Sequence, residues 1–217
     1  MHIPSKFKQT NLDILYQLIK DNPLGTLISS VDNDIDAIHI PFYLDTTGPG
    51  EVKLQGHVAK VNAIYKKCMD GSKVLIVFHG PNAYISPNFY PSKTKTGKVV
   101  PTWNYSVVHV KGTVSFKQES NWITSHLEKL TNTHESASQS KPWLMSDAPE
   151  EYTNKLVSAA VGLEIEIEDI IGNFKLSQNK STDDYDGVVV GLEDSSNELE
   201  SMVSKQMQEN NPRNRLS

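Results

Sequence analysis

Four histidines fall inside or at the edge of stretches with a β-strand pattern: His39, His57, His79 and His109. Imidazole is a common ligand of zinc, so four such side chains could gather around a metal at one end of a barrel. Their spacings match no ligand pattern, however, and no carboxylate recurs beside them. The sequence therefore favours hydrogen-bonding or anion-contacting roles for these histidines over a metal site.

A lysine and an asparagine follow one of these strands at the point where a short helix is expected to begin. Lys60 comes directly after the segment G-H-V-A, and Asn62 is a suitable N-cap. Free N–H groups at a helix start attract anions, and Lys60 adds its charge. The only two arginines, Arg213 and Arg215, lie in the last five residues. A phosphate bound elsewhere must therefore be held without a guanidinium group.

The stretch from Tyr84 to Gly112 is crowded with rigid side chains. Its aromatic residues and prolines are Tyr84, Phe89, Tyr90, Trp103, Tyr105, Pro87, Pro91 and Pro101. A rigid aromatic loop braced between two strands can wall a pocket for a flat ligand. The same composition is equally typical of an aromatic mini-core under a long loop.

Motifs for several common chemistries are absent from the sequence. Ser29, Ser86 and Ser106 lie outside any G-x-S-x-G elbow, and no base is visibly paired with Cys68. The dinucleotide, P-loop, C-x-x-C and H-E-x-x-H signatures do not occur either. Nucleophilic hydrolysis and the usual nucleotide and zinc sites therefore have no support, and Cys68 is expected in the core.

Hydrophobic periodicity predicts the elements that would position these residues. Expected helices cover residues 11–21, 62–68, 119–132, a segment after Asp147, and weakly 195–209. Residues 79–81 are expected to turn and 133–140 to form a loop. About six or seven strands joined mostly by short turns predict an antiparallel barrel with helices outside it. The expected strands are 24–31, 35–44, 52–58, 74–78, 83–86, 104–116 and 161–167.

Composition indicates one globular domain with a polar tail. The chain has 217 residues, 37% of them hydrophobic and 22% charged, and a net charge of −5. It contains one cysteine, no long apolar run and a polar N-terminal stretch, so we expect a cytoplasmic protein. The acidic balance disfavours a large nucleic-acid footprint. We expect the domain to cover residues 1–192 and the tail, partly helical or disordered, to cover 193–217.

Several segments, taken in order, resemble the PaiB family. They are I-H-I-P-F (38–42), G-H-V-A-K-V-N (56–62), F-H-G-P-N-A-Y-I-S-P-N-F-Y (78–90), V-P-T-W-N-Y-S-V-V-H-V-K-G (100–112), H-E (134–135), A-A-V-G-L-E-I-E-I (159–167) and K-L-S-Q-N (175–179). Members of this family are FMN-binding split-barrel proteins described as negative transcriptional regulators in bacilli. The resemblance runs from about His2 to Leu192.

The resemblance implies a mainly β fold with peripheral helices, an FMN-binding split β-barrel of the pyridoxamine-phosphate-oxidase-like Greek-key type. It also implies a homodimer with FMN at the subunit interface. Carried over by position, the cofactor-binding residues would be His39, His57, Lys60, Asn62, Trp103, Asn104, Lys175, Ser177 and Gln178. No metal ligands and no catalytic residues are carried over.

Two positions depart from the family pattern. Ile38 stands where a hydroxyl side chain is frequent, and Lys60 stands where arginine is frequent. Each change removes phosphate-binding capacity, because lysine cannot reproduce a bidentate guanidinium contact. The sequence therefore leaves two alternatives: a reduced affinity for flavin, or a pocket that holds a different ligand.

Three functions remain open at this stage. The first is a flavin-binding redox or sensing protein, with flavin-dependent oxidoreductase as the candidate enzyme activity. The second is a regulator acting through a protein partner or a metabolite, since no helix-turn-helix or basic recognition helix supports direct DNA binding. The third is a haem-binding or haem-degrading split barrel, because related barrels hold haem.

Overall fold

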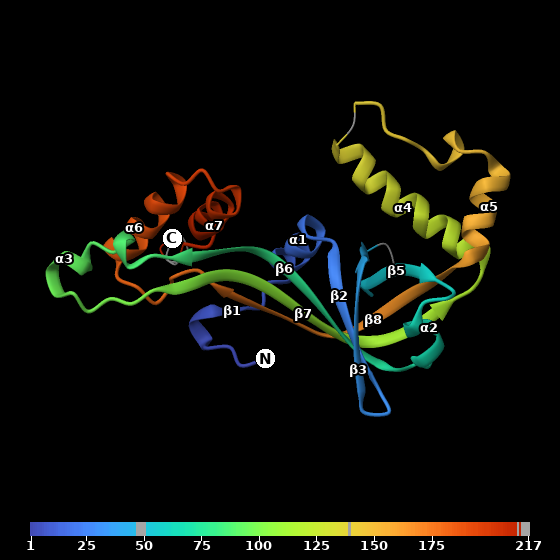
Figure 1. Cartoon of the computed structure of the whole chain (residues 1–217), viewed down its shortest axis with the longest axis horizontal. Helices are drawn as coiled ribbons and strands as arrows, with labels where there is room; N and C mark the ends of the chain where they lie inside the picture. The colour runs from blue at the N-terminus through green and yellow to red at the C-terminus, as the bar shows by residue number, and fades with distance from the viewer. Residues whose placement is uncertain (47–50, 139, 212, 214–217) are drawn as a thin grey trace. The chain divides into compact units, whose positions relative to one another are not determined.

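A computed structural model describes residues 1–46, 51–138, 140–211 and 213 of the chain (Figure 1). In chain order, with η for a 3-10 helix, the elements are η1 (Ser5–Phe7), β1 (Lys8–Gln9), α1 (Leu12–Asp21), β2 (Leu24–Val31), β3 (Asp34–Pro41), β4 (Tyr43–Asp45), β5 (Lys53–Ala59), α2 (Ala63–Lys67), β6 (Lys73–Ile85), η2 (Pro87–Phe89), α3 (Ser92–Thr96), β7 (Thr102–Lys117), α4 (Ser120–Ser138), η3 (Met145–Asp147), α5 (Glu150–Ala159), β8 (Ala160–Lys175), α6 (Thr182–Glu193) and α7 (Glu198–Glu209). Most of the turn expected at Thr46–Gly50 lies outside the described residues.

The strands form one antiparallel sheet, which confirms the predicted mainly β class with peripheral helices. Its order is β3-β2-β6-β7-β8-β5-β4, and β1 pairs with β8 beside that path. The β2–β3 hairpin pairs Leu24 with Pro41 at one end and Val31 with Asp34 at the other. Within the described residues no ladder joins β3 to β4, so the sheet is not closed.

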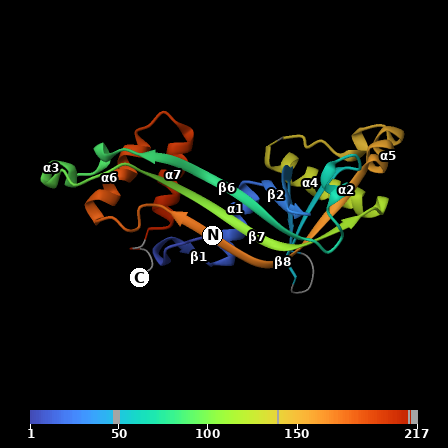
Figure 2. The same ribbon diagram turned by 60° about the horizontal axis from the view of Figure 1, so that its bottom comes forward.

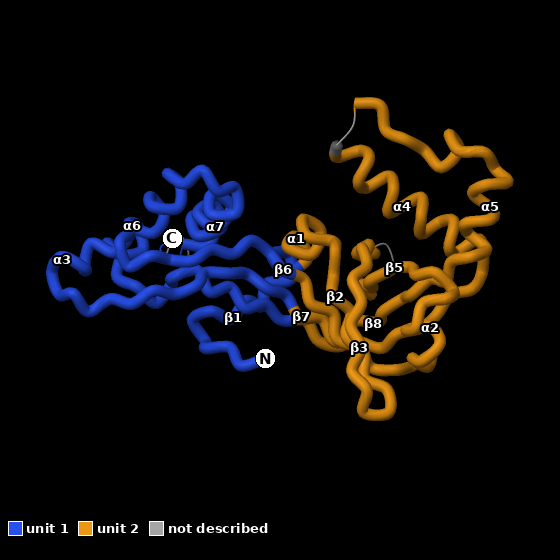
Figure 3. The backbone as a smooth tube through the Cα atoms, viewed as in Figure 1, with its two compact units in different colours: residues 1–15, 79–108, 171–217 blue, residues 16–78, 109–170 orange. Residues whose placement is uncertain are grey.

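The chain divides into two compact units (Figure 3). Unit 1 comprises residues 1–15, 79–108 and 171–217, and unit 2 comprises residues 16–78 and 109–170. The long strands β6, β7 and β8 each contribute residues to both. In unit 1, α6 and α7 pack against each other, and in unit 2, α4 packs against α5 (Figure 2). Each unit has buried apolar side chains of its own.

Strand β8 shows how the sequence pattern sets burial. Val161, Leu163 and Ile165 are completely buried, whereas Glu166 and Glu168 are exposed. Side chains alternate between the two faces of a strand, so an apolar residue at every second position buries one face. The alternation predicted from Val161 to Ile167 is confirmed as far as Ile165, whereas Ile167 is only partly buried. Glu168 pairs with Lys73 of β6 on the outer face.

The turn expected at 79–81 is absent, and that prediction was wrong. Strand β6 runs unbroken from Lys73 to Ile85, through Pro81. Among the described residues, the ladder between β2 and β6 extends only as far as Val77. Proline lacks an N–H group and is tolerated where a strand edge needs no donor. Pro81, which lies beyond that ladder, therefore does not end the strand.

Helix α4 is longer than expected. The loop predicted at 133–140 is wrong up to Ser138, because α4 continues that far. Thr133 supports the continuation, since its hydroxyl donates to the carbonyl of Lys129 at 2.8 Å. The weak helix predicted at 195–209 is present as α7, and its Val203 and Met207 are completely buried.

Candidate functional site

A pair of histidines joins the sheet to α4 in unit 2. His57 Nδ1 on β5 lies 3.1 Å from His126 Nε2 on α4. His126 is 1% exposed, and its ring stacks on Trp122 with centroids 5.4 Å apart and planes 19° apart. Gly162 of β8 lies opposite His57 in the ladder and leaves space for the Trp122 ring. His126 is a residue that the sequence analysis missed.

The geometry of the pair selects one tautomer. His126 Nδ1 is buried and has no hydrogen-bond partner among the described residues. A buried N–H without an acceptor costs more than a free acceptor position, so we infer that the proton of His126 is on Nε2. His126 Nε2–H then donates to His57 Nδ1. The second proton of the pair is therefore on His57 Nε2, where it can be donated to a further group.

Both imidazoles are held neutral. Burial lowers the pKa of His57. Burial lowers the pKa of His126 to about 4, and the nearby charges of His57 and Lys129 act in the same direction. Desolvation penalises the charged form of a histidine, so protonation of this pair is unfavourable near neutral pH.

We expect tautomer-sensitive NMR to find both histidines in the Nε2–H form at neutral pH. Long-range ¹H–¹⁵N correlations of labelled histidine distinguish the protonated from the unprotonated ring nitrogen. In His126→Phe, His57 loses its donor, and we expect its spectrum to shift toward a mixture of tautomers. A spectrum of the unaltered protein with the proton of His57 on Nδ1 would contradict the assignment.

Lys60 and Asn62 lie at the start of α2, as expected, but this helix offers fewer free N–H groups to an anion than predicted. It has five residues, and the Asn62 side chain already accepts the N–H of Ile64 at 3.0 Å. The Lys60 ammonium donates to the carbonyl of Ser158 at 2.6 Å. One N–H group of the helix start is therefore already taken, and the exposed Lys60 ammonium already has a carbonyl partner. His39 is exposed on β3, opposite Thr26.

An aromatic wall, made of Tyr84 on β6 and Trp103 on β7, lies open in unit 1. The two rings meet edge to face with centroids 6.2 Å apart. Tyr84 is 47% and Trp103 52% exposed, unusually high values for large aromatic side chains. These rings are therefore available to a flat ligand or to another protein surface.

Polar groups of β8 lie along the same part of β7. Lys175 Nζ donates to Thr102 Oγ1 at 2.6 Å, and Asn173 Nδ2 donates to the Tyr105 hydroxyl at 3.1 Å. Burial, followed by the charge of Lys180, lowers the pKa of the Lys175 ammonium. A half-buried cation therefore lies beside the residue that precedes Trp103.

The other polar side chains of the K-L-S-Q-N segment, Ser177 and Gln178, form hydrogen bonds with residues other than Thr102 and Tyr105. Ser177 and Asn104 are buried and hydrogen-bond each other at 3.0 and 3.2 Å. Ser177 has a φ of 63°, in the left-handed region, so the chain turns sharply after β8. The Gln178 amide accepts the N–H of Leu176 and donates to the carbonyl of Phe174. Asn104 and Ser177 thus have each other as partners.

Helix α6 contacts the residues between β6 and β7, the middle of the aromatic stretch from Tyr84 to Gly112. The sequence analysis did not predict this role. Asp184 of α6 accepts both the N–H and the hydroxyl of Ser92, at 3.0 and 2.8 Å. A Cβ on Gly191 would lie 2.3 Å from the Phe89 ring, so only glycine allows this approach. Gly187 and Gly191 recur at a spacing of four, which is a weak sequence signal for a closely packed helix face. Helix α6 itself was not expected.

The predicted site residues fall into two groups. Unit 2 contains His39, His57, Lys60 and Asn62, and unit 1 contains Trp103, Asn104, Lys175, Ser177 and Gln178. Within the described residues, no three His, Cys, Asp or Glu side chains gather as metal ligands. In that same part of the chain, no helix is long and apolar enough to cross a membrane.

Comparison with known proteins was made for sequence and for structure. Residues 1–169 match a protein family described as "Putative FMN-binding domain". The Emericella nidulans protein AN0679 is 34% identical over 227 aligned positions, which cover 89% of this chain and 90% of that protein. The Bacillus subtilis "Protease synthase and sporulation protein PAI 2" is 28% identical over 212 positions, covering 96% of this chain and 97% of that protein.

A solved structure shares the fold. The FAD and haem binding protein from Mycobacterium smegmatis superimposes with a TM-score of 0.56 and 14% identity, over 85% of this chain and 80% of that chain. At this identity the likeness concerns the fold alone. It confirms the predicted split-barrel class.

Proposed function

Because the chain belongs to the PaiB family of FMN-binding-domain proteins, we propose that it binds FMN. One observation in the structure supports this proposal most directly: the half-exposed aromatic wall formed by Tyr84 and Trp103. An isoalloxazine ring is flat and largely apolar, and it carries polar atoms at its edge. An open aromatic surface suits the flat part of such a ring.

The residues present fit a flavin by the chemistry of their donors. In unit 1, Trp103 would contact the ring and Lys175 would donate to its edge. The hydrogen bonds of Asn104, Ser177 and Gln178 would fix the backbone near the end of β8. Taken by itself, unit 2 offers four predicted donors to the phosphate or ribityl oxygens of a flavin: Lys60, His57 through its Nε2–H, His39 and Asn62. We assign these roles as proposals for all nine predicted residues.

We further propose that two copies of the chain associate. The aromatic wall leaves large apolar side chains in solvent, and Val100 beside it in sequence is 69% exposed. Apolar area of this kind is stabilised when a second surface covers it. A second copy would also shield a bound flavin from water. Sedimentation of the protein as a monomer at micromolar concentration would contradict this part of the proposal.

The flavin, when bound, would supply the electron or hydride chemistry. The chain's own contribution would be to bind the cofactor, orient it and limit the access of water. No side chain in the described residues stands out as an acid or base for a substrate, so we propose a redox or sensing role. A regulatory effect would act through a protein partner or a metabolite, because the net charge of −5 opposes DNA binding.

The test is an absorption spectrum of the purified protein, followed by titration with FMN and gel filtration. We expect a flavin spectrum that elutes with the protein. Trp103→Ala should weaken FMN binding by about tenfold, roughly 1.4 kcal/mol, because it removes the open ring surface. Trp143→Ala is a matched control, since Trp143 is 42% exposed but lies in unit 2.

Two outcomes would overturn the proposal. Protein that remains colourless and fails to retain FMN at any ratio would exclude flavin binding. Equal affinity in Trp103→Ala and the unaltered chain would remove the aromatic wall from the site. The same preparation titrated with haemin tests the haem alternative, for which a Soret band eluting with the protein is the expected signal.

A further inference from the structure

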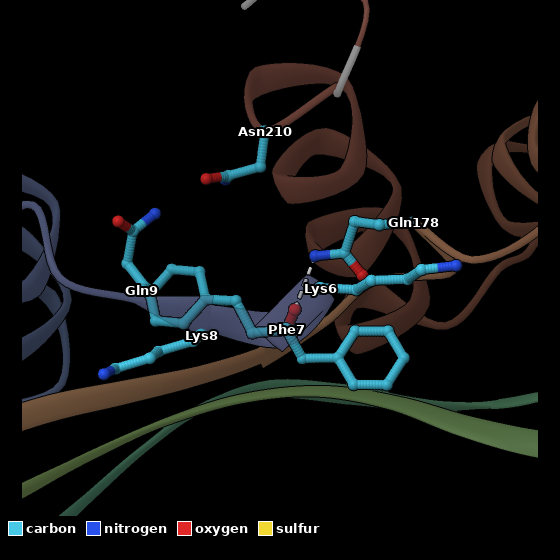
Figure 4. A pocket seen from close by; sticks show the side chains of 7 residues that line it. Lys6, Phe7, Lys8, Gln9, Gln178 and Asn210 are labelled. Carbon is cyan, nitrogen blue, oxygen red and sulfur yellow. Dashed lines mark hydrogen bonds between the residues drawn. The ribbon is translucent and has the colours of Figure 1, made fainter. Parts of the chain in front are cut away.

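A separate cavity of about 250 Å³ opens in unit 1, and its lining does not include the rings of the aromatic wall. It is bounded by the N-terminal segment, the residues around the end of β8 and the residue that follows α7. Its lining consists of Lys6, Phe7, Lys8, Gln9, Phe174, Gln178 and Asn210 (Figure 4). Of these residues, only Gln178 belongs to the predicted cofactor contacts.

Two carboxamides provide directed polar groups at this cavity. Gln9 is 6% exposed, and its Oε1 accepts the N–H groups of Thr10 and Asn11, both at 3.0 Å. Because both partners are donors, the orientation of this amide is fixed, and its Nε2 remains a donor. Asn210 Nδ2 donates to the carbonyl of Gln206 at 2.9 Å, which leaves Oδ1 as an acceptor. Neither Gln9 Nε2 nor Asn210 Oδ1 has a partner among the described residues.

The charge of the lining is entirely positive. Among the described residues that line it, Lys6 and Lys8 are the only ionisable ones, and none is a carboxylate. Their ammonium groups extend to opposite sides (Figure 4). Neither lysine forms an ion pair with any described residue. Phe7 and Phe174 add apolar side chains to the lining, and Phe174 is 3% exposed.

We propose that this cavity binds a small organic anion with a flat apolar body, of the aromatic carboxylate class. Cations at the rim, an anchored N–H donor and phenyl surface together match a carboxylate attached to a ring. The volume lies just under the range of about 300–1,000 Å³ typical for drug-sized ligands, so a one-ring anion is the suitable size. This inference does not depend on flavin binding.

The experiment is isothermal titration of the full chain with benzoate, and with benzamide as its neutral counterpart. We expect saturable binding of benzoate and binding of benzamide at least about tenfold weaker, because the lysines attract only the anion. The double variant Lys6→Gln/Lys8→Gln should weaken benzoate binding by about tenfold. Lys98→Gln removes an exposed lysine outside the lining and should leave the affinity unchanged.

A second variant tests the cavity itself. Asn210→Asp places a carboxylate at the cavity, and we expect it to abolish benzoate binding. Because it also removes the Nδ2 donor to the Gln206 carbonyl at the end of α7, we expect a slightly lower melting temperature, and thermal unfolding confirms that the variant is folded at the temperature of the titration. Three results would overturn the proposal: no saturable binding of benzoate up to about 10 mM, equal affinity for benzamide, or full competition by FMN. The last result would make the cavity part of the flavin site.

Discussion

Gly162→Ala will destabilise the protein by about 3 kcal/mol, at the upper end of the range for overpacked cores. A Cβ at this position would lie 2.1 Å from Trp122 Cζ3 and 2.6 Å from Cε3. The indole cannot retreat freely, because its other neighbour is the buried ring of His126. Thermal unfolding should show a melting temperature lower by roughly 6–12 °C, at about 2–4 °C per kcal/mol for a chain of this size.

Two further variants separate this clash from a general intolerance of glycine replacement. Gly56→Ala on β5 is the matched control, since its nearest neighbour is the terminal methyl of Ile40 at 3.1 Å. We expect Gly56→Ala to lower the free energy of unfolding by clearly less than Gly162→Ala does. Adding Trp122→Leu to Gly162→Ala should recover part of the lost stability. If Gly162→Ala has the same melting temperature as the unaltered protein, the packing of α4 on β8 is looser than the structure indicates.

The free energy of unfolding should fall as the pH drops from about 6.5 toward 4, in part because of His126. Its pKa is lowered from 6.5 to about 4 in the folded protein. In this window the unfolded chain binds the proton and the folded chain does not, so acid favours unfolding. A shift of this size corresponds to about 3 kcal/mol, fully present as stability above pH 6.5 and lost as the pH approaches 4.

The measurement is denaturant unfolding at a series of pH values, compared between variants because carboxylates also titrate in acid. His126→Phe keeps a ring against Trp122 and should flatten the slope between pH 6.5 and 4. His2→Gln removes an exposed histidine and should keep the slope of the unaltered protein. Identical slopes for the unaltered protein and His126→Phe would show that His126 is protonated equally in both states.

Much of the fold was predictable because burial on one face imposes a period of two. Strand β2 and the buried row from Val161 to Ile165 follow this rule closely. The error at Pro81 arose because proline was interpreted as a turn signal. Whether a proline breaks a strand depends on which neighbour needs its N–H group, and strand pairing is not visible in the sequence.

The candidate site was predictable in its motifs but not in its contacts. His57 was identified from the segment in which it lies, whereas His126 is 69 positions away on a helix with a mostly polar surface. The mutual hydrogen bonds of Asn104 and Ser177 span a separation of 73 residues. Long-range pairs of this kind depend on the completed sheet, so local pattern could not reveal them.

Helix α6 supports the aromatic stretch from a part of the chain that follows the matched family region. That region ends at residue 169, yet Asp184 of α6 accepts two hydrogen bonds from Ser92, and Gly191 approaches the Phe89 ring closely. The position of the residues between β6 and β7 therefore depends on a helix whose Asp184 lies 92 positions after Ser92 in the chain. A side chain at position 191 would displace the Phe89 ring without altering either ring of the aromatic wall.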